Sequence, residues 1–205
     1  MPRWFWWILG VWIAAVIGGA LNSAFAAPAH RYQRFLTAEV HRVWGLDGPV
    51  ALAAAQIDQE SKWNPRVCSP YACGLSQFTP STAEWMGREY PGELGLVDRF
   101  NPDWAIRALV LYDWHLREWV TWAESECERW AFTLSAYNGG QKYLIRERLR
   151  CAESETCDTS RWFGNVAWHR VRGKGPYREN RAYVRKIMLE LQPGYADWGP
   201  QVTCQ

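Results

Sequence analysis

Apolar residues recur at helical spacing along most of the chain beyond an apolar leader. The clearest case is residues 102–123, where Ile106, Leu109, Val110 and Trp114 follow one another at intervals that fit one helix face. Start and stop signals predict further helices over residues 32–43, 49–61, from 81, 128–137, 141–150 and 180–191. Alternating strand patterns are weak and no repeat is evident. The pattern predicts a mainly α single domain.

Several stretches between these helices have the residue composition of loops. Asn64-Pro65 ends the second helix, and a loop rich in Cys, Ser, Pro and Gly follows it to Gly74. Residues 87–101 contain Gly, Pro and acids and are predicted to be a loop. Residues 151–176 are basic, aromatic and Gly-containing, and we interpret them as an irregular insertion.

The first residues have the layout of an export signal. Arg3 precedes the uncharged, mostly apolar stretch 4–21, and Ala24-Phe25-Ala26 resembles a cleavage site. We predict a signal peptide over residues 1–26 and a domain over 27–205. The apolar stretch is also about long enough to span a bilayer, so a retained anchor with membrane association through residues 4–21 is the alternative. Both interpretations place the domain in the periplasm or on the outer face of the inner membrane.

Charge and cysteine content indicate which partners and which cysteine chemistry to expect. The net charge is only +2, from 23 basic and 21 acidic residues, which argues against nucleic acid as a partner. Six cysteines in an exported chain indicate disulfides. Short loops favour the pairs Cys68–Cys73 and Cys151–Cys157, which leaves Cys127 and Cys204 as the third pair. We expect no metal and no cofactor, because the cysteines and histidines lack zinc-ligand spacing.

Two carboxylates stand near the end of the second predicted helix, in AAAQIDQESKWNP (residues 53–65). At about 100° per residue, Glu60 lies on the same side as Val50, Leu52, Gln56 and Ile57. Asp58 lies about 160° away. We therefore expect Glu60 to face the core and Asp58 to face solvent.

Burial would give Glu60 a chemical use. Desolvation disfavours the charged carboxylate and raises its pKa, and such a group can act as a general acid near neutral pH. The structural alternative is a glutamate that caps the helix or pairs with Lys62.

Four short motifs follow one another along the chain. The first two are Glu60-Ser61 with Asn64-Pro65, and Gly74-Leu75-Ser76-Gln77 followed by Pro80-x-Thr82-Ala83. The other two are Ala136-Tyr137-Asn138-Gly139-Gly140 and Glu179-Asn180-Arg181-Ala182-Tyr183-Val184-Arg185-Lys186. Together these motifs resemble the lytic transglycosylases, murein-cleaving enzymes related to goose-type lysozyme. The resemblance covers about residues 45–190 and implies a lysozyme-like helical fold with a substrate groove.

The chain departs from the family pattern at several positions. Ser76 replaces a methionine, which we expect to change one wall of the groove. Gly139 replaces an alanine, and the loop from Ser69 to Gly74 is one residue shorter and carries two cysteines. Gly74 is expected to allow a close backbone approach or a positive φ.

The resemblance implies roles for particular residues. Glu60 would be the catalytic acid and Tyr183 would hold it by a hydrogen bond. Amide, hydroxyl and aromatic side chains would bind sugar, namely Ser61, Ser76, Gln77, Tyr137 and Asn138. Capping or packing is the structural alternative for each of them. Trp63 and Trp85 are candidates for stacking on sugar rings, and we interpret Arg161–Arg178 as a solvated loop, with contact to peptide stems or anionic wall polymer as the alternative.

The implied reaction is cleavage of the β-1,4 bond between N-acetylmuramic acid and N-acetylglucosamine in peptidoglycan glycan strands. It gives 1,6-anhydro ends and needs only Glu60. A hydrolytic muramidase would need a second carboxylate, with candidates at Glu84, Glu89, Glu93 and Asp98. A non-catalytic wall-binding module is the alternative from another class. The enzyme could serve secretion, conjugation or phage lysis machinery.

Overall fold

The computed structural model describes residues 29–204, and the predicted signal peptide lies outside them. The chain divides into two units at Arg34. Residues 29–34 of the first unit are helical. The second unit begins with helical residues 35–44 and contains all the elements discussed below. Within the described residues there is no strand longer than an isolated bridge, so the predicted mainly α class is confirmed.

The first half of the second unit contains four helices that carry or support the acidic motif. They are α2 (Val50–Ser61), α3 (Pro80–Glu89), α4 (Pro91–Leu94) and α5 (Pro102–Trp119). Thr79 caps α3 by accepting the Thr82 N–H, as the sequence signals predicted. The short α4 corrects the prediction that residues 87–101 are entirely loop, because Pro91 starts a single turn there. α5 ends earlier than predicted, at Trp119.

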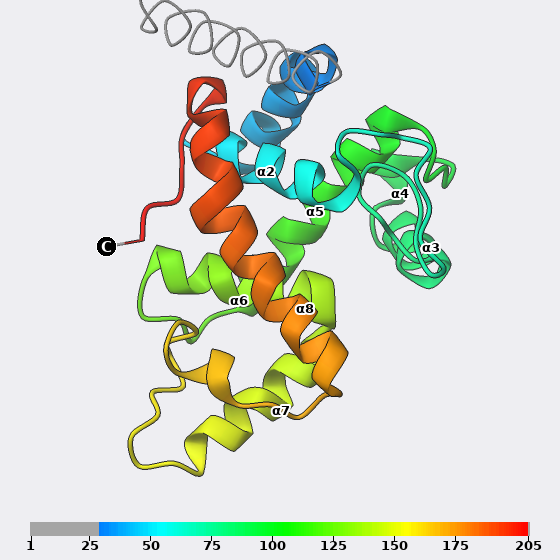
Figure 1. The fold of residues 1–205 in the computed structure, drawn as a ribbon. Helices are drawn as coiled ribbons and strands as arrows, with labels where there is room; N and C mark the ends of the chain where they lie inside the picture. Colours follow the sequence, from blue (N-terminus) through cyan, green and yellow to red (C-terminus); the bar gives the residue numbers. More distant parts are fainter. Residues whose placement is uncertain (1–28, 205) are drawn as a thin grey trace, which may run out of the picture. The chain divides into compact units, whose positions relative to one another are not determined.

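The second half consists of α6 (Glu126–Gly139), α7 (Gln141–Ala152), η1 (Val166–Trp168), α8 (Lys174–Arg185), η2 (Lys186–Leu191) and η3 (Gln192–Trp198). Figure 1 shows α8, η2 and η3 continuing as one rod past α6 and α2. The last helix therefore begins at Lys174, six residues before the predicted start at Asn180. α6 begins at Glu126, where Ser125 caps it. Among the described residues, no helix combines the length and apolar character needed to cross a bilayer.

α2 lies at the centre of the second unit's core. Every residue from Val50 to Ile57 is buried, and the helix packs against η2 and η3. Its run of alanines lets these neighbours approach closely. Lys62 and Trp63 adopt positive φ values of 52° and 61°, so the left-handed turn ends α2 before Asn64 does.

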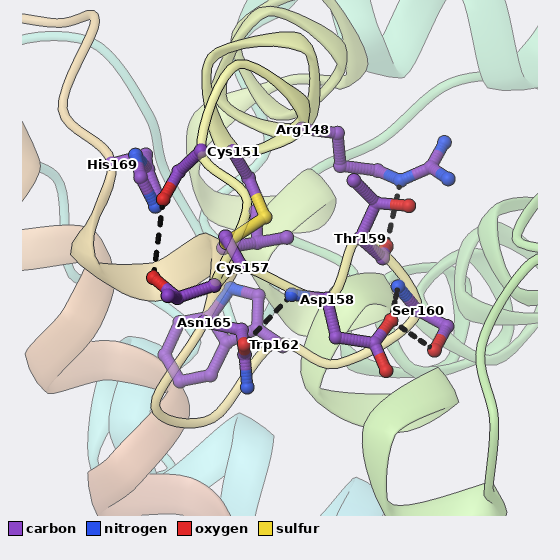
Figure 2. The surroundings of a disulfide bond; sticks show 12 residues. Arg148, Cys151, Cys157, Asp158, Thr159, Ser160, Trp162, Asn165 and His169 are labelled. Atoms are coloured by element: carbon purple, nitrogen blue, oxygen red, sulfur yellow. Dashed lines mark hydrogen bonds between the residues drawn. A yellow bond between two sulfur atoms is a disulfide. The ribbon is translucent and has the colours of Figure 1, made fainter.

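All three predicted disulfides are present: Cys68–Cys73, Cys127–Cys204 and Cys151–Cys157. The last of these ties the end of α7 to the insertion, and Figure 2 shows His169 beside it. Both sulfur atoms are engaged in the disulfide, so this cluster offers no thiolate to a metal ion.

The insertion is a packed element, which corrects its interpretation as a solvated loop. Trp162 and Val166 are fully buried and join the core around α6 and α8. The carboxylate of Glu128 accepts the backbone N–H groups of Trp162 and Phe163, at 2.6 and 3.1 Å. Arg181 donates to the carbonyl of Ala167 at 2.7 Å. These contacts fix the path of the chain from α7 to α8.

Candidate active site

A cavity of about 570 Å³ opens where the C-terminal end of α2 meets α6 and α8. Glu60 lies in its wall, partly buried. The hydroxyl of Tyr183 donates to Glu60 Oε1 at 2.6 Å, across 123 residues of sequence. Tyr137 stacks beside Tyr183, with ring centroids 6.4 Å apart and planes 12° from parallel.

The surroundings of Glu60 favour its protonated form. Burial raises the pKa of Glu60 to about 8, and the charges of Asp113 and Glu179 act in the same direction. The hydrogen bond from Tyr183 opposes them, because it stabilises the carboxylate. A carboxyl group with this pKa is mostly protonated at neutral pH, which is what a general acid requires.

Asp58 lies on another side of α2, as the helical projection predicted, but it is not simply solvated. Its carboxylate accepts from the hydroxyl of Tyr195 at 2.9 Å and pairs with Lys62 at 3.0 Å. It does not line the cavity. The two carboxylates of this helix therefore cannot act as a facing pair.

Three of the residues expected to bind sugar lie in the cavity wall: Gln77, Tyr137 and Asn138. The amide nitrogen of Gln77 donates to the carbonyls of Gly74 and Val67, at 2.9 and 3.1 Å, so its oxygen remains available as an acceptor. Asn138 Oδ1 accepts from Asn180 at 2.9 Å. In the described part of the chain the Asn138 Nδ2–H group has no protein partner, so it can donate into the cavity.

The two serines of the expected sugar-binding set have structural contacts instead. The Ser61 hydroxyl donates back to the Ile57 carbonyl at 3.1 Å, and the residue is buried outside the cavity wall. The Ser76 hydroxyl donates to the Ala105 carbonyl on α5 at 2.6 Å. The carbonyl of Ser76 accepts from the Tyr137 hydroxyl at 2.8 Å. Ser76 thus supports the cavity wall through its bond to Tyr137.

The loop before α3 depends on Gly74. Its φ is +83°, and a Cβ there would lie 1.9 Å from the carbonyl oxygen of Arg99, so both parts of the expectation for this glycine are met. The adjoining disulfide loop brings Ser69 and Tyr71 to the cavity, and Tyr71 is 79% exposed. Neither was assigned a role from sequence, although Ser69 begins the shortened loop before Gly74.

The two tryptophans expected to stack on sugar do not line the main cavity. Trp63 is buried and its indole N–H donates to the Tyr195 hydroxyl at 2.8 Å, so it is a core residue. Trp85 lines a neighbouring cavity of about 280 Å³ and packs edge-on against His115. This cavity shares Thr82 and Tyr112 with the main one.

The acidic residues of the main cavity wall, within the described chain, are Glu60 and Glu179. None of Glu84, Glu89, Glu93 and Asp98 lines it. Glu93 pairs with Arg42 at 2.7 Å. Glu179 belongs to the C-terminal motif, but nothing in its sequence context separates it from other surface acids.

A profile of the transglycosylase SLT domain matches residues 44–156, more than half of the chain. The chain belongs to this family. The match contains Glu60 and the cavity residues of α6, and it ends within the first residues of the insertion, before α8. The part of the resemblance carried by Tyr183 therefore lies outside the matched stretch.

Similar curated proteins include the membrane-bound lytic murein transglycosylase F of three bacteria. The Vibrio cholerae protein is 35% identical over 112 residues, which cover 54% of this chain and 19% of that protein. The proteins of Serratia proteamaculans and Yersinia enterocolitica are each 37% identical over 98 residues, covering 47% of this chain and 18% of theirs. The chain thus spans about a fifth of the length of these relatives.

Proposed function

We propose that this protein is a peptidoglycan lytic transglycosylase that cleaves the bond between N-acetylmuramic acid and N-acetylglucosamine. The observation that carries the proposal is the state of Glu60. It lies in a cavity wall, its pKa is raised to about 8 by burial, and the Tyr183 hydroxyl bonds it at 2.6 Å. Membership of the transglycosylase SLT family supports the same reaction.

In the proposed mechanism Glu60 acts first as an acid and then as a base. It gives its proton to the glycosidic oxygen, and the bond from that oxygen to C1 of the muramic acid breaks. The C6 hydroxyl of the same sugar forms a bond to C1, and the Glu60 carboxylate takes the hydroxyl proton. The products are a free sugar hydroxyl and a 1,6-anhydro end, and the protein returns to its starting protonation.

Tyr183 suits both halves of this cycle. Its hydrogen bond fixes the orientation of the acid, and it stabilises the carboxylate that exists between the two proton transfers. Gln77 and Asn138 would supply an acceptor and a donor to sugar hydroxyl and N-acetyl groups. Tyr137 would form part of the floor beneath the sugar.

The hydrolytic alternative finds less support. Its second carboxylate was expected from residues 84–98, and none of those acids lines the main cavity. Glu179 would be the group to activate water if the reaction were hydrolytic. A binding module without activity would have no use for an acid held in this state.

The proposal includes export from the cytoplasm. Three disulfides suit an oxidising compartment, and the similar proteins are named as membrane-bound. Cleavage or retention of residues 1–26, and service to secretion, conjugation or phage lysis machinery, stay predictions from the sequence.

Replacing Glu60 with glutamine tests the role of the acid. The amide has nearly the same shape but cannot donate the proton, so release of fragments from purified murein should fall by about 10²–10⁴-fold. Asp58→Asn is the matched control, since it makes the same chemical change two residues away and outside the cavity. Full activity of the Glu60→Gln protein would remove the basis of the proposal.

A further inference from the structure

A second cavity, of about 210 Å³, adjoins the main one on the side of the insertion. It shares Asn138 and Glu179 with the main cavity. Its other walls are Gly139, Tyr143 and the end of the insertion at Arg172, Gly173 and Pro176. A strand of substrate in the main cavity could therefore place a side group here.

Arg172 directs a buried hydrogen-bond donor toward this cavity. Only 3% of its side chain is exposed. Two of its guanidinium nitrogens bind Glu147 as a fork, Nε to Oε1 at 2.9 Å and Nη2 to Oε2 at 3.0 Å. The third nitrogen, Nη1, has no hydrogen-bond or ion-pair partner among residues 29–204, although the guanidinium carbon lies 5.1 Å from the ring of Tyr143.

Gly139 makes room for that donor. A Cβ at this position would lie 1.8 Å from Arg172 Nη1. The alanine expected in the Tyr-Asn motif would therefore collide with the guanidinium. An alanine here would have to displace the guanidinium from its fork with Glu147, so Gly139 is compatible with Arg172 in the position it occupies.

The charges around Arg172 do not balance. Glu147 is fully buried and also pairs with Arg181 at 2.9 Å, so two guanidinium groups share one carboxylate. Burial lowers the pKa of Arg181, and the charge of Arg172 lowers it further, against the opposing effect of Glu147. Glu179 lines the cavity but forms no ion pair with either arginine within the described residues. A buried excess of positive charge is costly and favours an anion at the open donor.

We propose that this cavity is a subsite for a carboxylate of murein, bound by Arg172 Nη1. The proposal rests on the proposed function for its choice of substrate. Murein carries carboxylates on its peptide stems, and on the lactyl group of muramic acid where a stem has been removed. Glu179, on the wall shared with the main cavity, would accept an amide N–H of the stem, so the site offers both signs of charge to an acidic peptide.

The insertion would then be the element that supplies substrate preference. Cys151–Cys157 closes one end of it, and the bonds from Trp162 and Phe163 to Glu128 hold its middle. Arg172 lies further along this fixed segment, and Glu147 on α7 holds its guanidinium.

Equilibrium binding to soluble glycan strands tests the subsite without cleavage. All proteins would carry Glu60→Gln, with or without Arg172→Gln, and Arg178→Gln is the control because Arg178 is exposed and lines neither cavity. Arg172→Gln leaves Glu147 paired with Arg181, so we expect the fold to survive, which a thermal melt would check. The strands would be intact, freed of stems by an amidase, or intact with every carboxylate converted to a methylamide.

We expect Arg172→Gln to weaken binding of carboxylate-bearing strands by about 10- to 100-fold and to leave methylamide strands unchanged. A loss confined to intact strands would assign the site to a stem carboxylate. A loss confined to stem-free strands would assign it to the lactyl carboxylate. Equal losses on all three forms, or no loss on any, would overturn the subsite. Failure of the protein lacking these substitutions to cleave murein would instead count against the proposed function.

Discussion

Replacing Asp113 with asparagine should stabilise the protein at neutral and alkaline pH. Asp113 lies on α5, next in sequence to Tyr112 of the cavity wall, and only 3% of it is exposed. Its Oδ1 accepts the Gln56 side-chain N–H at 3.2 Å, and it forms no ion pair within the described chain. An asparagine oxygen can accept the same bond, so the substitution removes the acid and keeps the contact.

The size of the effect follows from the pKa of this group. Burial raises the pKa of Asp113 from 3.8 to about 8, against the smaller, opposite effect of the Gln56 bond. The unfolded chain releases this proton near pH 4, whereas the folded protein keeps it until about pH 8, so stability is lost as pH rises between those values. At 1.36 kcal/mol per pH unit, the loss is at most roughly 6 kcal/mol.

Urea unfolding of the oxidised protein between pH 5 and pH 8 would measure this effect. The unfolding free energy falls as pH rises. In the Asp113→Asn protein this fall should be smaller by about 1.4 kcal/mol per pH unit. Part of the decline should remain, because Glu60 also has a raised pKa. Asp197→Asn, at an exposed position, is the control. If the unfolding free energy of the Asp113→Asn protein falls with pH as steeply as that of the wild type, Asp113 is not the buried, unpaired acid described above.

Three further predictions concern the cavity wall. The kcat/KM for murein should fall as pH rises through about 8, because the pKa of Glu60 is about 8 and the acid form is needed; a rate that is flat to pH 10 would contradict this. Tyr183→Phe should lower kcat by about 10-fold and move that alkaline fall to higher pH, because the lost bond favours the carboxylate; an unmoved pH profile would indicate a packing role only. Replacing Cys68 and Cys73 together by serine should cost about 2 kcal/mol of stability in a denaturant titration, and it should raise KM more than it lowers kcat, since this loop borders the cavity.

The helices and disulfides could be predicted because their signals are local. Apolar spacing and caps such as Thr79 specify a helix within a few residues. Cys68–Cys73 and Cys151–Cys157 close short loops, which left one remaining pair. Glu60 could be placed by helical projection, although α2 proved to be buried on every side from Val50 to Ile57.

The errors arose where tertiary contacts decide. Ser76 and Ser61 were assigned to substrate from their motifs, but their hydroxyls bond backbone carbonyls, which no motif reveals. The insertion was interpreted as solvated because it is basic and rich in turn residues, whereas Trp162 is buried and Arg172 is buried in an ion pair with Glu147. The buried acid Asp113 gave no signal, since a single polar residue on an amphipathic helix resembles a surface position.

The most direct test of the central claim is the mass of the ends that the oxidised protein releases from purified murein. Transglycosylation through Glu60 predicts muropeptides with 1,6-anhydro-muramic acid, one water lighter than reducing-end products. Reducing ends as the main product would contradict the account and would indicate water activated by a second carboxylate, with Glu179 the acid to replace next.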